Sequence, residues 1–167
     1  MPAMDAAAVA RSYFEAIARR DLDAVAGHWD PEVVVDFTGL GVYRGADEMR
    51  DFFAGLFGAI PDVEMTARRV VGGEGVAVVE WRMHGNFTGS PLLGIDATGG
   101  WVEQRGCDVI EVSDDGKITR NTAYMDGMEL GRSLGMLPPL DSPAERAMKQ
   151  AFNLATKARL ALRERFG

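Results

Sequence analysis

Residues 101–126, WVEQRGCDVIEVSDDGKITRNTAYMD, have the pattern of two strands around a tight turn. Alternating polar and apolar residues predict strands at 101–112 and 117–126, and SDDGK supplies the turn. Successive strand residues point to opposite faces, so one face of the first strand carries Val102, Gln104, Gly106, Asp108, Ile110 and Val112. This face has fewer charges than the other, and we expect it to point inward. Asp108 is therefore predicted to lie in the interior.

The pattern continues on the amino-terminal side of this hairpin. Period-two alternation predicts strands at 63–71 and 75–84, and the β-branched segment EVVVDF predicts a strand at 32–37. Apolar residues at helical spacing predict helices at 5–20, 21–30 and 47–60, with Pro31 and Pro61 ending the second and third. Helices segregated from mostly antiparallel strands indicate an α+β fold, with the helices packed on one face of a curved sheet.

The composition limits the classes of function. The chain has 167 residues, enough for one domain with a core, and a formal net charge of −7. This charge argues against nucleic acid or an anionic membrane as the main partner, so a small molecule or a protein is expected. One cysteine, Cys107, cannot form an internal disulfide, and no apolar segment is long enough for a membrane span or a signal peptide. A cytoplasmic protein is the expectation.

Two segments lie outside this scheme. Residues 85–100, GNFTGSPLLGIDATGG, are predicted to be a long loop of the kind that shapes binding sites. Residues 139–167 are predicted to be a helical extension of a domain at 1–138, because Ser142, Pro143 and Glu145 form a capping box. The helix has six basic residues and two acidic ones, a net +4, which leaves −11 for the rest of the chain. We expect it to pack on its own acidic domain or on a partner subunit, with a membrane surface as the alternative.

Three segments in this order resemble the nuclear transport factor two-like superfamily: SYFEAIARRDLDAVAGHWDPEVVVDF (12–37), YRGADEMRDFF (43–53) and DVIEVSDDGKITRNTAYMD (108–126). HGNFTGSPLLGIDATGG (84–100) and YMDGMELGRSLGML (124–137) resemble SnoaL-type polyketide cyclases, and the helix and strand positions also resemble ketosteroid isomerase. The resemblance covers about residues 4–138 and implies a cone-shaped α+β barrel, in which a curved antiparallel sheet wraps the helices around an apolar cavity. It also implies a homodimer and a small hydrophobic ligand.

Asp108 and Tyr13 are the first candidates for chemistry in this cavity. An ionised carboxylate is costly in apolar surroundings, so burial is expected to raise the pKa of Asp108. A neutral carboxylic acid can donate a hydrogen bond to an oxyanion, and ketosteroid isomerase pairs such an acid with a tyrosine. In this sequence Tyr13 lies at the position of that tyrosine, and Asp108 lies at the position of the acid. Together the two side chains could donate hydrogen bonds that stabilise an enolate. The alternative is that both residues are structural. Tyr13 would then be an ordinary core residue, and Asp108 would accept hydrogen bonds from the backbone or from Arg105.

The general base of ketosteroid isomerase is missing from this sequence. Phe37 occupies its position, and the neighbouring Asp36 points to the opposite strand face. Trp29 and Phe53 replace the tyrosines that support the oxyanion site of that enzyme. Steroid isomerisation of that kind is therefore not expected.

Asp126 is the alternative base. It matches the acid/base aspartate of SnoaL-type cyclases and the last-strand aspartate of limonene epoxide hydrolase, where it could take a proton from carbon or activate water. The isomerase alignment instead puts Met125 in the pocket and faces Asp126 outward. Asp126 is then a solvated strand-end residue or a cap for the turn that follows.

No metal or cofactor is expected. His28, His84 and Cys107 lack metal-ligand spacing, and the sequence has neither a P-loop nor a dinucleotide fingerprint. The residues expected to contact a substrate are Trp29, Phe37, Phe53, Phe57, Trp81, Met83, Gln104 and Met125. Those expected at a dimer interface on the convex sheet face are Glu80, Arg82, Trp101 and Arg105.

Three functions are consistent with these residues. The leading hypothesis is a cofactor-independent cyclase or isomerase for an enolisable or polycyclic carbonyl compound, with Asp126 as acid/base and Tyr13 and Asp108 as oxyanion donors. The second is an epoxide hydrolase in which Asp126 activates water. The third is a non-catalytic small-molecule binding protein, which the phenylalanine at position 37 favours.

Overall fold

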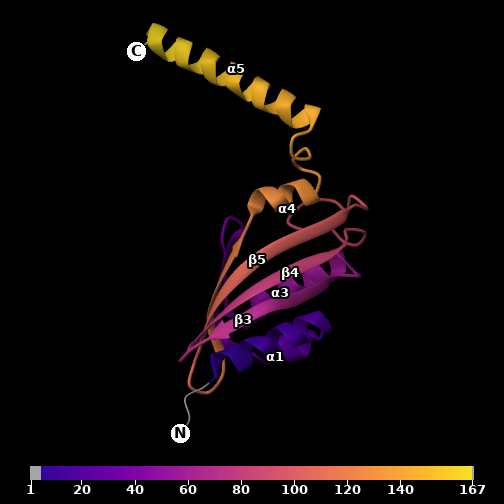
Figure 1. Ribbon diagram of the computed structural model, residues 1–167, viewed down its shortest axis with the longest axis vertical. Coiled ribbons are helices and arrows are strands. Elements are labelled where there is room, and N and C mark those ends of the chain that lie inside the picture. Colours follow the sequence, from indigo (N-terminus) through magenta and orange to yellow (C-terminus); the bar gives the residue numbers. More distant parts are fainter. Residues whose placement is uncertain (1–4, 167) are drawn as a thin grey trace.

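The predicted hairpin lies in the middle of a six-stranded sheet. The computed structural model describes residues 5–166, and in it β5 (Trp101–Val112) and β6 (Ile118–Met125) pair antiparallel. The other strands are β1 (Trp29–Phe37), β2 (Gly41–Arg44), β3 (Glu64–Gly72) and β4 (Val76–Asn86). Their order across the sheet is β2-β1-β6-β5-β4-β3 (Figure 1). The α+β architecture is confirmed.

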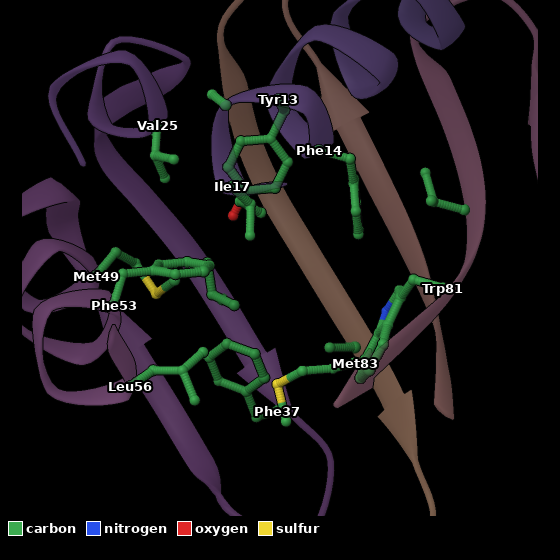
Figure 2. Packing of buried hydrophobic residues seen from close by; sticks show 14 of the residues in the cluster. Tyr13, Phe14, Ile17, Val25, Phe37, Met49, Phe53, Leu56, Trp81 and Met83 are labelled. Atoms are coloured by element: carbon green, nitrogen blue, oxygen red, sulfur yellow. The ribbon is translucent and has the colours of Figure 1, made fainter. Parts of the chain in front are cut away.

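Three helices lie on the inner side of this sheet, the first and third in contact with strands and the second in contact with the other two helices. They are α1 (Ala6–Ala18), α2 (Leu22–Ala26) and α3 (Gly45–Ala59), and the Asp5 carboxylate caps α1 by accepting from the N–H groups of Ala7 and Ala8. The helix α1 packs against β3, β4 and β5, whereas α3 packs against β1 and β2. Figure 2 shows Tyr13, Phe14 and Ile17 of α1 pointing into the space between the sheet and α3. The core of the protein therefore lies between the helices and the concave side of the sheet.

The sheet differs from the expectation in three respects. It is mixed, because β1 pairs parallel with β6 while the other neighbouring strands are antiparallel. It does not close, because in the described residues the edge strands β2 and β3 do not pair with each other. The helix expected at 21–30 ends at Ala26, and Trp29 and Pro31 belong to β1. The β1–β6 register shifts between Trp29 and Val34, and proline is tolerated at such an irregularity because it has no N–H to donate. The short strand β2, in the segment GLGVYRG, was not predicted.

The loop after β4 is held against the end of α3. The N–H groups of Gly89 and Ser90 donate to the carbonyls of Ala59 and Gly58, at 2.9 and 3.1 Å. A β-carbon at Gly89 would lie 1.9 Å from the Gly58 carbonyl oxygen, so this approach requires glycine. The loop thereby places Leu92 and Leu93 beside the core.

Two helices follow the sheet. The short helix α4 (Gly127–Ser133), which was not predicted, contacts β5. The long helix α5 (Pro143–Phe166) projects away from the sheet (Figure 1). Of the two expectations for this helix, packing on its own domain is contradicted, and packing on a partner subunit stays a prediction. No helix among residues 5–166 combines the length and apolar character needed to cross a membrane.

Candidate active site

A cavity of about 70 Å³ lies between the inner face of the sheet and helices α1 and α3. Its walls are largely apolar, and Leu93 at its mouth is 45% exposed. The lining residues are Tyr13, Phe14, Ile17, Phe37, Leu40, Phe52, Phe53, Leu56, Met65, Trp81, Met83, Leu92, Leu93, Gln104, Asp108, Asn121, Met125 and Leu130. Four of these, Tyr13, Gln104, Asp108 and Asn121, carry polar groups into an apolar space, which is the usual form of a ligand site.

Asp108 lies on the inner face of β5, as the alternation predicts, and is 4% exposed. Its Oδ1 accepts a hydrogen bond from Trp81 Nε1 at 2.6 Å, and its Oδ2 accepts one from Asn121 Nδ2 at 2.7 Å. Burial raises the pKa of Asp108 to about 6, although both hydrogen bonds act in the opposite direction. Asp108 is thus held as a proton acceptor whose pKa is close to neutral pH.

A glycine makes room for the Trp81 donor. Gly106 faces Trp81 across the β4–β5 pair, and a β-carbon at Gly106 would lie 2.2 Å from Cζ2 of the indole. The indole therefore lies over the strand backbone at the one position where no side chain interferes. Two residues further along the same face, its N–H reaches Asp108.

Tyr13 brings a neutral hydroxyl to the same cavity. The side chain is 2% exposed and makes edge contacts with the rings of Phe14, Trp29 and Phe53. Burial, and then the negative charge of Asp108, raise the pKa of Tyr13. Tyr13 therefore remains a protonated hydrogen-bond donor throughout the physiological pH range.

Two buried amide oxygens in the cavity have no partner among the described residues. Gln104 Nε2 donates to the carbonyls of Arg105 and Asp126, and Asn121 Nδ2 donates to Asp108, which leaves Gln104 Oε1 and Asn121 Oδ1 unpaired. A buried polar group left unpaired costs about 1–3 kcal/mol. The site therefore favours a ligand or water that donates hydrogen bonds to these oxygens.

Asp126 is not in the cavity. It is the N-cap of α4, is exposed, and accepts hydrogen bonds from the N–H groups of Met128 and Glu129 at 2.9 and 3.1 Å. Met125 lines the cavity instead, because alternation along β6 turns the next side chain outward. The expected place of Asp126 beside Tyr13 and Asp108 is contradicted, and we assign it no acid/base role.

Most of the expected wall residues lie where they were predicted. Phe37, Phe53, Trp81, Met83, Gln104 and Met125 line the cavity. Trp29 is buried behind Tyr13, and Phe57 is half-buried on the side of α3, so neither reaches it. Asn121 was missed, although it lies on the same strand face as Ala123 and Met125 and period-two counting would have found it.

Neither histidine lines the cavity, although the His28 ring makes an edge contact with Tyr13. His28 has its Nδ1 2.7 Å from the Ala24 carbonyl and its Nε2 2.9 Å from Ser12 Oγ. His84 stacks on Trp101 on the outer sheet face, where Arg82 pairs with Glu103 at 2.6 Å and Arg105 with Glu129 at 2.9 Å. Within residues 5–166, no three histidine, cysteine or acidic side chains are grouped so that they could hold a metal ion.

Comparisons with known proteins agree with this architecture. A family model described as a SnoaL-like domain matches residues 10–121. No curated protein matched the sequence.

Three solved structures illustrate the shared fold. AclR from Streptomyces galilaeus is 21% identical, with 92% of this chain and 94% of that chain covered and a TM-score of 0.69. A protein assigned as a polyketide cyclase from Xanthomonas campestris pv. campestris is 24% identical, with coverages of 77% and 96% and a TM-score of 0.64. An LEH-like epoxide hydrolase from M. tuberculosis is 19% identical, with coverages of 78% and 90% and a TM-score of 0.62.

Proposed function

Since the chain belongs to the SnoaL-like domain family, we propose that it is a cofactor-independent cyclase or isomerase in which Asp108 is the acid/base group. The observation that carries the proposal is a single carboxylate, with a pKa of about 6, buried in an apolar cavity that a tyrosine hydroxyl also lines. A general base works best when its pKa is near the operating pH. Asp108 meets this condition, and Asp126 does not share the cavity.

The reaction begins with proton transfer from carbon. Asp108 takes the proton from the carbon next to a substrate carbonyl, and the electrons of the broken C–H bond move onto the carbonyl oxygen to form an enolate. Tyr13 donates a hydrogen bond to that oxygen, and the apolar walls exclude water that would weaken this bond. In an isomerisation, a double bond conjugated with the enolate carries the negative charge to a different carbon, and Asp108 returns its proton there. In a cyclisation, Asp108 returns its proton to the group that the enolate carbon has attacked.

The cavity also limits the substrate. An engineered apolar cavity of about 150 Å³ binds benzene. The present cavity of about 70 Å³ is smaller, so a cyclic ligand enters by displacing side chains at the mouth, where Leu93 is exposed. A hydroxyl or N–H on the ligand would satisfy Gln104 Oε1 and Asn121 Oδ1. The expected substrate is an apolar cyclic carbonyl compound that carries such a donor.

Deuterium exchange tests the proton transfer without knowledge of the natural substrate. The wild-type protein is incubated with 2-tetralone in D2O, and loss of the α-proton signals is followed by NMR. We expect acceleration by the wild-type protein, none by Asp108→Asn, and an unchanged rate for Asp126→Asn. Binding of 2-naphthol, an enol analogue, without any exchange would instead favour a non-catalytic binding protein.

An epoxide hydrolase is the second candidate. Asp108 and the unpaired Asn121 Oδ1 lie together and could hold a water for attack on an epoxide, while the neutral Tyr13 hydroxyl could donate to the epoxide oxygen. Incubation with styrene oxide in water labelled with oxygen-18 separates the two functions. A labelled diol formed by the wild-type protein and absent with Asp108→Asn would favour the hydrolase over the isomerase or cyclase.

A further inference from the structure

A second hollow lies beside the cavity, between helix α1 and the edge strand β3. This α1–β3 groove has a volume of about 370 Å³ and is lined mainly by Arg11, Glu15 and Ala18 of α1 and by Met65, Ala67 and Arg68 of β3. At one end α1 touches β3, because a β-carbon at Gly72 would lie 2.7 Å from the β-carbon of Ala7. Further along, the small side chains of Ala18 and Ala67 leave the groove open.

Two side chains form the wall between the groove and the cavity. Phe14 and Met65 line both spaces. Phe14 is 2% exposed and makes an edge contact with the ring of Tyr13. Met65 is half-buried and lies opposite Met83 of β4. A methionine side chain is unbranched and adapts to its surroundings, so rotation of Met65 would join the two spaces.

A β-bulge in β3 adds a charged side chain to the groove. Met65, Ala67 and Val70 pair with buried residues of β4, and the step from Ala67 to Val70 is one residue longer than strict alternation gives. The register shift lies between Ala67 and Arg69, so Arg68 is the extra residue. A bulge on an edge strand redirects side chains. Arg68 lines the groove as a result.

The charges of the groove favour an anion. Its charged lining residues are Arg11, Glu15, Arg68 and Arg69. Arg11 donates to the Val70 carbonyl at 3.4 Å and Arg69 lies 3.8 Å from Glu80, whereas Arg68 has no ion pair with any residue from 5 to 166. Three arginines less Glu15 and Glu80 leave a local charge of +1 in a chain of net charge −7.

This local charge matters more than the charge of the whole chain. Exposed charges more than about 8–10 Å away are largely screened at physiological salt. A local charge of +1 matches a monoanion, and a guanidinium binds a carboxylate through two parallel N–H groups. The groove therefore suits a carboxylate.

We propose that the α1–β3 groove holds the carboxylate of an elongated ligand whose apolar part lies in the cavity, with Met65 displaced between them. The inference rests on the proposed function for the chemistry at Asp108 and adds that the substrate carries a carboxylate on an apolar chain. Ala67 in the groove pairs with Trp81 of β4, and Trp81 donates to Asp108 of β5. Only β4 lies between the groove strand and the strand of Asp108, so a carboxylate held in the groove would anchor the apolar part near Asp108.

Binding of octanoate and 1-octanol to the full chain, followed by ligand-observed NMR, tests the role of the arginines. We expect Arg11→Gln with Arg68→Gln to weaken octanoate binding by roughly 2- to 20-fold at low salt, as for the loss of two exposed ion pairs. Octanol, which has no charge, should bind as before. Arg120→Gln with Arg159→Gln removes two exposed arginines outside the groove and the cavity, and this matched control should change neither affinity. Octanoate that does not bind, or that responds equally to both pairs of substitutions, would overturn the proposal.

Ala67→Leu tests whether one ligand occupies both spaces. The larger side chain would fill the groove at a position that does not line the cavity. Octanoate and octanol should both bind about fivefold or more weakly, whereas 2-naphthol, which is expected to lie in the cavity alone, should keep its affinity. Val71→Leu, at a position of β3 that is 58% exposed and outside the groove, is the control. Equal weakening of 2-naphthol, or unchanged octanoate binding, would contradict a ligand that spans both spaces.

The binding test and the deuterium exchange test can fail separately. Octanoate binding that depends on Arg11 and Arg68, without any exchange of 2-tetralone, would leave the groove assigned and reject the proposed chemistry. Exchange that requires Asp108, with octanoate binding indifferent to the two arginines, would reject the groove and keep the chemistry.

Discussion

Asp108 illustrates, at the scale of one residue, how a reactive group is kept at the expense of stability. Burial raises its pKa from 3.8 to about 6, so the folded protein binds a proton more tightly than the unfolded chain does. The extra stability of the protonated form is fully present below pH 3.8 and is lost as the pH rises to about 6. Two hydrogen bonds, from Trp81 and Asn121, limit this loss.

Asp108→Asn should therefore stabilise the protein in a pH-dependent manner. At pH 8 we expect the free energy of unfolding to rise by up to about 3 kcal/mol. The reason is that the variant has no buried carboxylate to ionise, whereas burial raises the pKa of Asp108 by about two units in the wild-type protein. The gain should be smaller at pH 4.5, where Asp108 is already protonated. Urea denaturation at both pH values measures the difference. Asp126→Asn, which keeps an N-cap residue in an exposed position, should change stability little at either pH.

Gly106 is expected to act on the reaction through Trp81. Gly106→Ala would push the indole aside and remove a hydrogen bond that lowers the pKa of Asp108. The pH at which deuterium exchange reaches half its maximal rate should therefore move upward. Gly127→Ala, where an added β-carbon meets no atom within 4 Å, is the control. A pH profile that does not move while tryptophan fluorescence changes would show that Trp81 does not tune Asp108.

At the scale of elements, strands were easier to predict than the segments between them. The inner face of β5 follows from period two alone, and its burial confirms the prediction. The loop between β4 and β5 has no such period, and its place depends on two hydrogen bonds to the end of α3. This contact is what brings Leu92 and Leu93 to the cavity.

Gly89→Ala should release this loop. The new methyl group would meet the Gly58 carbonyl, so we expect a loss of about 1–3 kcal/mol in the free energy of unfolding. Gly55→Ala in α3 has open space around it and should stabilise the helix by about 0.5–1 kcal/mol. Chemical denaturation compares the two variants, and acrylamide quenching of tryptophan fluorescence reports whether the cavity has opened. Equal stabilities would show that the loop does not depend on this contact.

At the scale of the whole molecule, the body and α5 have different roles. The core consists of residues from α1 to α4, the sheet and the loops between them, and among the side chains described up to residue 165 no buried apolar one comes from α5. A chain that ends at Pro138 should therefore keep its fold and its deuterium exchange activity. Circular dichroism and the exchange assay measure these two properties. Loss of the circular dichroism signal of the sheet would show that α5 is needed for the fold.

Local patterns in the amino-acid sequence were sufficient to predict several elements. Helix caps, helical spacing and period-two alternation depend on residues close together in the chain, and they predicted α1, α3, α5, four strands beyond β1, and the inward direction of Asp108. These patterns could not exclude Asp126 from the cavity. Asp126 follows the cavity-lining Met125 directly, at the end of a strand where alternation no longer fixes the direction of a side chain.

Local patterns do not determine which side chains meet in the cavity. Trp81, Asp108 and Asn121 come from three strands, and Tyr13 comes from a helix 95 positions before Asp108. Whether they share a cavity depends on strand register and helix packing, which are set by contacts distant in sequence. The parallel β1–β6 pair and the projecting α5 were decided in the same way. Local preferences are satisfied by many arrangements of the same elements, and only burial of the whole core selects one of them.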